Sequence, residues 1–466
     1  MQTSSRESID FYERRGFWGE ESLDSLFRRT VAIHPRRLAL CDPPDREFFA
    51  DGAPKRLSYS ELFAAVRDTS AKLLAAGLQK DQVIVVQLPN TVETVILYLA
   101  IARIGALLCP VSIDQNLSSL TEISLSLRPY MYVGGRYRHR NLLRQACAWL
   151  PESCIFASFQ TQSDGNDIVD LSLDQPANPE DIRHLGQIMD ANLVTPNEVF
   201  TLTWKRYTDR YPAIPRTHNQ WFALASFVAE GASLCNGDSL LCAFPLSEAS
   251  GIGGLLYNWL MTGGKMVLSQ THRPETLLLQ LREENIICVG LTPQILTTLA
   301  PTLKQSQPLP QLRSIITGFS HANIEDCTKL AGELNINLLN CYSTSEGASL
   351  LTAPADRLEG WQEPLFPRFE DQIEGWQSRM SRMVRTRLKS SDSLKEITEP
   401  GQPGTLFIKG PSLFDHYYTG EGLIEAEEEI EPAFCAGGYK NTGDLFVIDE
   451  QNPRFYRFIG RIKSTT

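Results

Sequence analysis

The sequence of 466 residues lacks an apolar run long enough to span a bilayer, and its N-terminal segment lacks the hydrophobic stretch of a signal peptide. It also lacks a basic excess, since 44 lysines and arginines against 55 aspartates and glutamates give a net charge of -11. Nucleic-acid binding needs a basic face, which this balance argues against. These absences predict a cytoplasmic protein that binds neither nucleic acid nor membrane.

Closely paired cysteines are missing as well. The ten cysteines occur singly, mostly in apolar surroundings, and no Cys-x-x-Cys pair is present. Disulfide frameworks and metal-thiolate sites use cysteines that are closely spaced or paired. We therefore expect buried free thiols in a reducing compartment, with neither a zinc site nor a disulfide framework.

Glycine is absent between Gly186 and Gly231. A loop that wraps a triphosphate needs glycines, because its backbone N–H groups converge on the anion in conformations that a Cβ atom would block. Basic side chains can attract phosphate without such a cradle, although a surface loop with scattered charges is the plainer interpretation. The basic side chains of this stretch are Lys205, Arg206 and Arg210.

The pattern of apolar residues is that of an α/β protein. Residues 58–77 show helical spacing and begin with Ser58 and Glu61, which form a capping-box pair. The apolar run 83–88 predicts a buried strand, and a helix and a strand at 107–111 follow it. This order is a βαβ unit, and further helices and strands alternate after it.

After about residue 365 the pattern changes to short strands and turns, which favours a barrel-like β subdomain. We expect a first α/β subdomain at 1–190, a second at 191–365 that contains the segment from Thr203 to Arg210, and a β-rich, barrel-like subdomain at 366–466. The segment 355–400 has alternating charge with scattered tryptophan and methionine, which suggests an amphipathic helix in the core or on a partner surface.

Two segments point to a known family. Residues 215–219 read Pro-Arg-Thr-His-Asn, and residues 11–18 read Phe-Tyr-Glu-Arg-Arg-Gly-Phe-Trp. Both resemble the adenylate-forming superfamily, closest to the 2,3-dihydroxybenzoate– and salicylate–AMP ligases of siderophore biosynthesis. The resemblance extends from about Phe11 to Lys463. It implies a degenerate phosphate loop without the family's glycines, formed by Thr203, Lys205, Arg206, Thr208 and Arg210. It implies the large domain of these enzymes, with the small C-terminal lid domain and its catalytic lysine absent, so that we assign no catalytic residue.

Two motifs carry residues that the resemblance assigns to adenine and to the metal ion. Residues 341–347 are similar to the family segment in which an aromatic residue lies near adenine and a glutamate helps to hold the magnesium of MgATP. This implies the first role for Tyr342 and the second for Glu346, and Gly318 ends the strand whose backbone lies against adenine. From the residues alone, Tyr342 also fits a core position and Glu346 a helix cap.

The ribose contacts follow from the last two motifs. Residues 438–444 resemble the family segment whose aspartate accepts hydrogen bonds from the ribose hydroxyls, which implies that role for Asp444. Residues 458–463 resemble the segment that leads to the lid domain, and Arg461 stands at the position that approaches the ribose. Thr-Gly-Asp is also an ordinary turn sequence.

The acid pocket departs from the family pattern. Glu248 and Ala249 stand where the aryl-acid ligases have a histidine and the asparagine that bonds the substrate acid. A carboxylate here would repel a carboxylate substrate, and a lost buried partner costs about 1–3 kcal/mol. Phe319 follows Gly318 at the strand end, where it either fills the space of an aryl ring or adenine or remodels the pocket for a different acid.

Taken together, these departures predict a catalytically impaired homologue of an aryl-acid–AMP ligase that acts as a scaffold or carrier-protein-binding module in siderophore or nonribosomal-peptide biosynthesis. The alternative is an active enzyme that uses ATP and Mg²⁺ to activate a small carboxylic acid for a carrier-protein thiol, with the lid supplied elsewhere. A third interpretation is a nucleotide-binding regulator that uses Asp444 and Tyr342.

Overall fold

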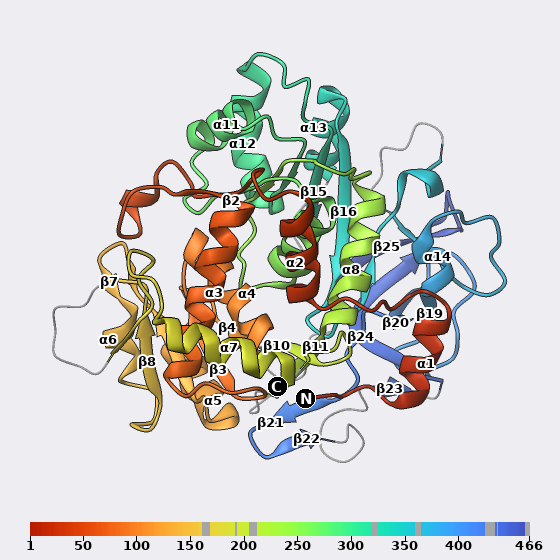
Figure 1. The fold of residues 1–466 in the computed structure, drawn as a ribbon. Helices are drawn as coiled ribbons and strands as arrows, with labels where there is room; N and C mark the ends of the chain where they lie inside the picture. Colours follow the sequence, from red (N-terminus) through yellow and green to blue (C-terminus); the bar gives the residue numbers. More distant parts are fainter. Residues whose placement is uncertain are drawn as a thin grey trace.

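Three large sheets form the framework of the chain, with helices packed between and around them (Figure 1). The computed structural model describes residues 1–160, 168–191, 193–204, 212–318, 325–358, 365–424, 434–435 and 437–461. The helices are α1 (Arg6–Arg14), α2 (Leu23–Ile33), α3 (Tyr59–Ala75), α4 (Val92–Ile104), α5 (Leu117–Leu127), α6 (Leu142–Ala146), α7 (Pro179–Ala191), α8 (His218–Gly231), α9 (Ala249–Gly251), α10 (Tyr257–Thr262), α11 (Pro274–Glu283), α12 (Pro293–Gln305), α13 (Glu325–Leu334) and α14 (Arg379–Met383).

The first sheet is built around parallel strands that are apolar on both faces. In β3 every residue is buried, as expected for a strand with helices on either side. The strand order is β22 (Gly422–Ile424), β21 (Tyr417–Thr419), β11 (Ala213–Thr217), β10 (Val199–Trp204), β4 (Leu107–Pro110), β3 (Val83–Gln87), β5 (Met131–Gly134), β8 (Ile155–Ser158) and β9 (Ile168–Asp170). A short hairpin, β6 (Arg136–Tyr137) and β7 (Arg140–Asn141), stands apart from it.

The second sheet combines strands from distant parts of the sequence. Leu40 of β1 pairs in parallel with Met266 of β13, so the N-terminal hairpin extends a sheet made mainly from residues after 239. The strand order is β17 (Ser349–Leu350), β16 (Asn337–Ser343), β15 (Ser314–Gly318), β14 (Cys288–Gly290), β12 (Leu240–Cys242), β13 (Met266–Leu268), β1 (Leu38–Cys41) and β2 (Arg56–Ser58).

Helices and the first two sheets alternate in layers. Inward residues of both sheets, such as Ile84 and Leu240, belong to one core that also includes α3, α4 and α8. The opposite face of the first sheet packs against α5 and α6, and that of the second sheet against α11, α12 and α13. Successive side chains of a strand point to opposite faces, which is why each sheet contributes to two cores.

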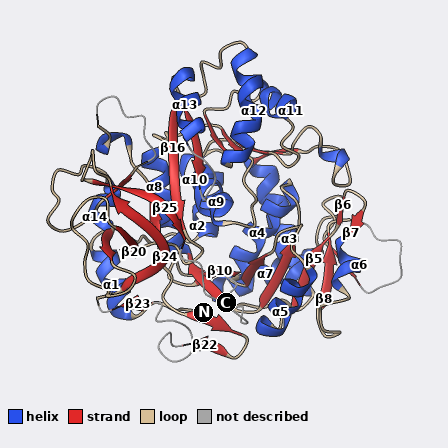
Figure 2. Cartoon of the chain, turned by 180° about the vertical axis from the view of Figure 1, so that it is seen from behind, coloured by secondary structure: helices blue, strands red, loops and turns tan. Residues whose placement is uncertain are grey.

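The third sheet is antiparallel and comes from the C-terminal part of the chain (Figure 2). Its strand order is β18 (Phe366–Pro367), β25 (Phe455–Arg461), β24 (Tyr439–Ile448), β20 (Pro403–Lys409) and β19 (Arg385–Lys389), and β23 (Phe434–Cys435) pairs with β24. The fold class is thus the expected one, with two α/β sheet units and a smaller β unit. The domain boundaries at residues 190 and 365 stay a prediction.

Several local expectations are confirmed, and one is wrong. The capping box of α3 forms, because Ser58 and Glu61 each bond the backbone of the other. The prediction of an amphipathic helix over 355–400 is wrong for the described part of that segment, which forms the strands β18 and β19 and the short helix α14. β18 pairs with β25 and β19 pairs with β20. These pairings give the backbone N–H and C=O groups of the segment hydrogen-bond partners in other strands, so that no helix is needed to satisfy them.

The cysteines and the membrane expectation can be compared with the described ranges. Of the described cysteines, Cys147 and Cys235 are exposed, which corrects the expectation that the thiols are buried; the others apart from Cys435 are buried. Across these ranges, no helix combines the length and the apolar character that crossing a bilayer requires.

Candidate active site

The nucleotide residues expected from the sequence meet at a buried carboxylate. Asp444 in β24 is fully buried, and its Oδ2 accepts a hydrogen bond from the Tyr342 hydroxyl at 2.7 Å. Arg461 in β25 donates to the same carboxylate, from Nε to Oδ1 at 2.6 Å and from Nη2 to Oδ2 at 3.2 Å. The register of β24 and β25 places Asp444 opposite Arg461. We call Tyr342, Asp444 and Arg461 the carboxylate cluster.

Tyr342 occupies the core position that the sequence allowed, and its role near adenine stays a prediction. Its ring packs against Phe366 and Phe446, with centroids 6.0 and 5.2 Å away. Desolvation by burial raises the pKa of its hydroxyl, so Tyr342 donates its proton to Asp444. The hydrogen bond to Asp444 raises the pKa of Arg461. The cluster therefore places a charged guanidinium and a neutral phenol on one carboxylate.

Gly318 lies beside this cluster at the end of β15. Its φ is +94°, a conformation that L side chains rarely adopt, and an added Cβ atom would lie 2.3 Å from the carbonyl oxygen of Cys341. Cys341 precedes Tyr342 and pairs with Gly318 in the sheet. Glycine is thus required here by the close approach of two strands. Phe319, the next acid-pocket residue, lies outside the described residues.

Glu346 lies in a tight turn after β16. Its side chain is 1% exposed, and one carboxylate oxygen lies 4.0 Å from Nζ of Lys440. The backbone of the turn is fixed from the other side, because Phe414 N–H donates to the Glu346 carbonyl and the Ser412 hydroxyl donates to the Gly347 carbonyl. These hydrogen bonds hold the backbone of the turn in place and so fix the position of the buried Glu346 carboxylate.

Arg216 packs behind this turn and was quoted in a motif without a predicted role. It is fully buried in β11, with its guanidinium carbon 3.9 Å from the ring centroid of Trp221. Its Nη2 donates to the Gln220 carbonyl at 3.3 Å, while Nε and Nη1 have no hydrogen-bond partner among the described residues. Desolvation lowers its pKa to about 9, and the nearby charge of Glu346 opposes that shift.

A cavity of about 320 Å³ opens at the end of β16. Ser343, which follows Tyr342 of the carboxylate cluster in the sequence, lines it. The end of β10 contributes Thr203 and Trp204, the segment before and within α9 contributes Glu248 and Ala249, and residues 343–345 line it as well. The structure thus brings three predicted site residues, Thr203, Glu248 and Ala249, to one cavity. Four others, Lys205, Arg206, Thr208 and Arg210, lie outside the described residues.

Glu248 contributes the charge of this cavity. Glu248 is solvent-exposed, so it lies at the mouth of the cavity rather than at its bottom. Partial desolvation by the surrounding protein nevertheless raises the pKa of its carboxyl above the ordinary value. Among the described residues that line the cavity, Glu248 is the single one with a titratable side chain.

The residues that sequence reasoning missed are polar side chains around this cavity. Thr344 lies within the segment 341–347 and Ser250 follows Ala249, but no pattern distinguishes a hydroxyl that lines a cavity from one that caps a turn. Trp204 lies in the glycine-free stretch, and the sequence assigned it no role. The contact of Lys440 with Glu346 joins β24 to the turn after β16, and no sequence signal predicts that pairing.

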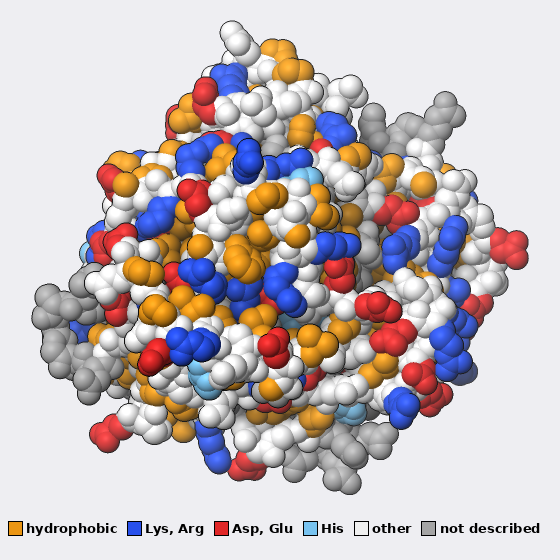
Figure 3. Space-filling view, in the orientation of Figure 1, with side chains coloured by type: hydrophobic (Ala, Val, Ile, Leu, Met, Phe, Trp, Pro, Cys, Tyr) orange, Lys and Arg blue, Asp and Glu red, His pale blue; other side chains and the backbone are white. Residues whose placement is uncertain are grey.

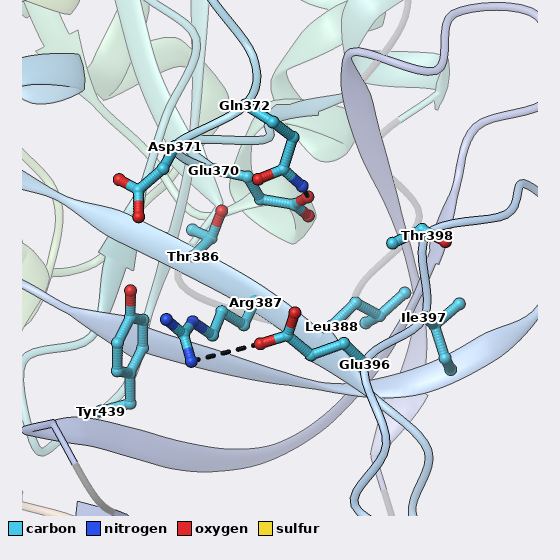
Figure 4. Close-up of a pocket in the computed structure, with 10 residues that line it drawn as sticks. All are labelled: Glu370, Asp371, Gln372, Thr386, Arg387, Leu388, Glu396, Ile397, Thr398 and Tyr439. Carbon is cyan, nitrogen blue, oxygen red and sulfur yellow. Dashed lines mark hydrogen bonds and ion pairs between the residues drawn. The ribbon is translucent and has the colours of Figure 1, made fainter.

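A smaller cavity of about 60 Å³ lies on the third sheet (Figure 4). An ion pair between Arg387 and Glu396 borders it at 3.2 Å, and the Arg387 guanidinium also lies over the Tyr439 ring. Both members of the ion pair are substantially exposed, so solvent screens their attraction. On the face drawn in Figure 3, acidic and basic side chains are interspersed with scattered hydrophobic ones.

His218 belongs to the quoted Pro-Arg-Thr-His-Asn segment, and the structure makes it a neutral core residue. Its Nδ1 accepts a hydrogen bond from the backbone N–H of Leu23 at 3.2 Å and lies 3.0 Å from the Tyr257 hydroxyl. The ring is buried and stacks on Phe200. Desolvation lowers its pKa from 6.5 to about 3. His218 thus supports the start of α2 instead of exchanging protons near neutral pH.

This burial predicts an acid-dependent loss of stability. The unfolded chain takes up a proton at His218 as the pH falls below 6.5, while the folded chain does so only near 3. Stability is therefore lost on acidification, by about 2 kcal/mol between pH 7.5 and pH 5. In His218→Asn, whose amide oxygen can still accept from Leu23, the free energy of unfolding measured in urea should fall less over this interval. Equal slopes for both proteins would contradict the assignment.

Comparison with known proteins identifies the family of the chain. The sequence matches the family described as AMP-binding enzyme over residues 27–182 and 213–418, which together exceed half of the chain. The 2,3-dihydroxybenzoate-AMP ligase of Bacillus subtilis (strain 168) is 24% identical over 460 residues, covering 94% of this chain and 75% of that protein. The medium-chain fatty-acid–CoA ligase of Escherichia coli (strain K12) is 23% identical over 462 residues, covering 97% and 74%.

The fold agrees with these relatives. The apo structure of MbtA from Mycobacterium smegmatis superposes with a TM-score of 0.77 at 21% identity, covering 100% of this chain and 80% of that chain. The predicted resemblance to adenylate-forming enzymes, with aryl-acid–AMP ligases among the relatives, is confirmed. The interval between the two matched segments, 183–212, contains the predicted phosphate-binding residues from Thr203 to Arg210. This chain belongs to the AMP-binding enzyme family.

Proposed function

We propose that this chain binds a nucleotide at the carboxylate cluster and a small carboxylic acid in the adjacent cavity, but forms the acid adenylate poorly. Its main role is then that of a scaffold or carrier-protein-binding module in siderophore or nonribosomal-peptide biosynthesis. The observation that carries the binding part is that the end of β16 supplies consecutive residues to both features, because Tyr342 belongs to the cluster and Ser343 lines the cavity.

The carboxylate cluster suits the ribose of a nucleotide. Each carboxylate oxygen of Asp444 can accept more than one hydrogen bond, so two ribose hydroxyls can be added to the protein donors already present. Arg461 is half exposed, so it can turn aside and let ribose hydroxyls take its place on the buried carboxylate. Hydrogen bonds to a charged group contribute about 1.5–3 kcal/mol, which makes Asp444 the main anchor.

Glu346 suits Mg²⁺ only in combination with phosphate. Mg²⁺ prefers oxygen ligands and is commonly bound through one or two carboxylates together with substrate phosphates. Among the described residues, no group of three or more His, Cys, Asp or Glu is arranged to hold a metal ion. Glu346 would therefore supply one carboxylate, and the metal would neutralise phosphate charge during adenylation.

Adenylation requires the acid carboxylate to attack the α-phosphorus of ATP, which forms the acyl–phosphate bond and releases pyrophosphate. Most of its acceleration comes from positioning and from stabilisation of developing charge. The segment that holds phosphate in relatives has no glycine here, and Ala249 cannot bond the acid. The loss of both contacts supports weak adenylation.

A second candidate is an active acid–AMP ligase that passes the acyl group to a carrier-protein thiol and releases AMP. The cavity of about 320 Å³ favours this candidate, because a chain that still turns over a small acid would keep a pocket of this size with polar lining residues. In that case Lys205, Arg206 and Arg210 would replace the glycine cradle.

Calorimetry with ATP and AMP, with and without Mg²⁺, tests the binding part of this proposal. We expect binding of both nucleotides, and no detectable heat at millimolar concentration would overturn the proposal. Pyrophosphate exchange with salicylate, 2,3-dihydroxybenzoate and a panel of small acids tests the chemistry, with the Bacillus subtilis relative as the reference enzyme. We expect rates at least 100-fold below the reference, and rates within tenfold of it would establish the second candidate instead.

A further inference from the structure

A buried lysine lies on the same face of β24 as Asp444. The buried residues Lys440, Thr442 and Asp444 alternate along this strand, so their side chains point to one of its two faces. The Lys440 side chain is 8% exposed. Lysine is almost never buried without a partner, because its ammonium group loses its hydration there. The burial of Lys440 therefore indicates that other groups of the protein balance its charge.

Glu346 and two aromatic rings hold this ammonium group. Lys440 Nζ lies 4.0 Å from a carboxylate oxygen of Glu346, whose side chain is 1% exposed. It also lies 5.8 Å from the ring centroid of Phe414 and 5.9 Å from that of Tyr417. The negative faces of aromatic rings attract a cation at such distances. A carboxylate and two aromatic faces thus keep a positive charge beside Glu346.

This region carries more positive than negative charge. Desolvation lowers the pKa of buried Arg216 and the charge of Glu346 opposes that shift, so these two groups lie close together. The hydrogen bond to Asp444 raises the pKa of Arg461, and the Glu346 charge adds to that rise, so Glu346 also lies near the carboxylate cluster. Among these described groups, three cations, Arg216, Lys440 and Arg461, accompany two carboxylates, Glu346 and Asp444. The excess positive charge favours an anionic ligand.

A magnesium ion at Glu346 would have to compete with Lys440. Mg²⁺ demands oxygen ligands at about 2.0–2.1 Å in near-octahedral geometry. On Glu346 it would lie within a few ångströms of the Lys440 ammonium group, and like charges at that distance repel each other strongly in a protein interior. Over the described ranges, no group of three or more His, Cys, Asp or Glu could hold a metal ion. The surroundings of Glu346 therefore suit an ammonium group better than a divalent metal ion.

We propose that Lys440 supplies, beside Glu346, the positive charge that a divalent cation supplies at a metal-dependent nucleotide site. The Lys440 ammonium group attracts the phosphate oxygens of a nucleotide whose ribose is held at Asp444, and the chain binds ATP equally well with and without Mg²⁺. This inference rests on the nucleotide site of the proposed function. It makes Lys440 the residue that determines the metal dependence of binding.

Calorimetry with ATP on the full chain tests this inference. The dissociation constants in millimolar Mg²⁺ and in excess EDTA should agree within threefold, and a larger difference would overturn the inference. Lys440→Met keeps an unbranched apolar side chain between the aromatic rings but removes the ammonium group. This variant should bind ATP in EDTA at least tenfold more weakly than the unchanged chain, and Mg²⁺ should then tighten its binding at least fivefold. An unchanged affinity in EDTA would refute the role of Lys440.

A matched variant and a second ligand control for indirect effects. Lys395 is exposed and follows β19 in the same sheet, so Lys395→Met removes an equal charge from a solvated position and should change neither constant by more than twofold. Adenosine, which has no phosphate, should bind Lys440→Met as tightly as the unchanged chain. A parallel loss of adenosine affinity would mean that Lys440 only shapes the carboxylate cluster, and it would refute the inference.

Glu346→Gln gives an independent test, and it is the deciding variant if Lys440→Met does not fold in thermal denaturation. Removal of the carboxylate releases the Lys440 ammonium group for phosphate. ATP should therefore bind this variant in Mg²⁺ at least as tightly as it binds the unchanged chain. A lower affinity in Mg²⁺ would show that Glu346 serves a metal ion, which contradicts the inference.

These measurements separate the inference from the proposed function. ATP binding that requires Mg²⁺ refutes the inference and leaves nucleotide binding intact, whereas the absence of ATP binding in both conditions refutes both. Pyrophosphate exchange as fast as in the reference enzyme refutes weak adenylation, and the comparison of Mg²⁺ with EDTA still decides the role of Lys440.

Discussion

Replacing Gly347 with alanine should lower the free energy of unfolding by about 3 kcal/mol or more. Gly347 has a φ of +92°, and an added Cβ atom would lie 2.0 Å from the carbonyl oxygen of Ser412 and 3.0 Å from Cζ of Arg216. The left-handed conformation costs about 1–2 kcal/mol for a residue with a side chain, and overpacking costs about 1–3 kcal/mol more. Urea denaturation of both proteins measures the difference.

Two further glycines separate the causes of that loss. Gly16 also has a positive φ, of +67°, but has open space around its Cβ position, so Gly16→Ala should cost only about 1–2 kcal/mol. Gly332 lies in α13 with open space and an ordinary φ, and alanine there should stabilise the chain by up to about 1 kcal/mol. If Gly347→Ala behaved like Gly16→Ala, the close packing of Ser412 and Arg216 on the Glu346 turn would be refuted.

The second large effect concerns Asp444. Asp444→Asn should weaken ATP and AMP binding at least tenfold, because hydrogen bonds to a charged acceptor contribute about 1.5–3 kcal/mol and a tenfold change corresponds to about 1.4 kcal/mol. Stability should fall only by about 1–2 kcal/mol, because half-exposed Arg461 can be solvated and the asparagine oxygen can still accept from Tyr342. Calorimetry with each nucleotide and urea denaturation measure the two quantities.

Asp449 offers a matched control for this variant. It follows β24, is 4% exposed, and binds Arg457 at 2.8 Å, and its carboxylate also accepts from the backbone of Gln451 and Asn452, so these partners lie outside the carboxylate cluster. Asp449→Asn should lower stability by a similar amount and leave nucleotide affinity unchanged. A loss of affinity in both variants would mean that Asp444 acts through the stability of the third sheet instead of contacting the ligand.

Local sequence patterns predicted the parts of this structure that depend on neighbouring residues. The capping box at Ser58 and Glu61 needs only two residues three positions apart, and the buried run of β3 needs only continuous apolar character. Both are confirmed. The expected helix over 355–400 failed because charge and apolar spacing in that segment serve strands paired with residues far along the chain.

The candidate site shows the same division. The resemblance of short motifs identified Tyr342, Asp444 and Arg461, but only the third sheet places Arg461 opposite Asp444 and brings Tyr342 from the second sheet to the same carboxylate. No pattern indicated that Trp204 and Thr344 would line one cavity, or that a buried polar atom of each would have no hydrogen-bond partner among the described residues. Whether a polar atom is satisfied depends on every group within a few ångströms, most of which are distant in sequence.

The sequence by itself therefore determined the α/β class, the family and the residue types of the carboxylate cluster. Those features depend on local periodicity and on short motifs, which a single chain displays in order. The tertiary structure alone decided that β1 joins the second sheet, that Arg216 is buried behind the Glu346 turn, and that the cavity has Glu248 as its single titratable lining residue among those described. These depend on long-range packing, which brings together residues whose separation along the chain carries no signal.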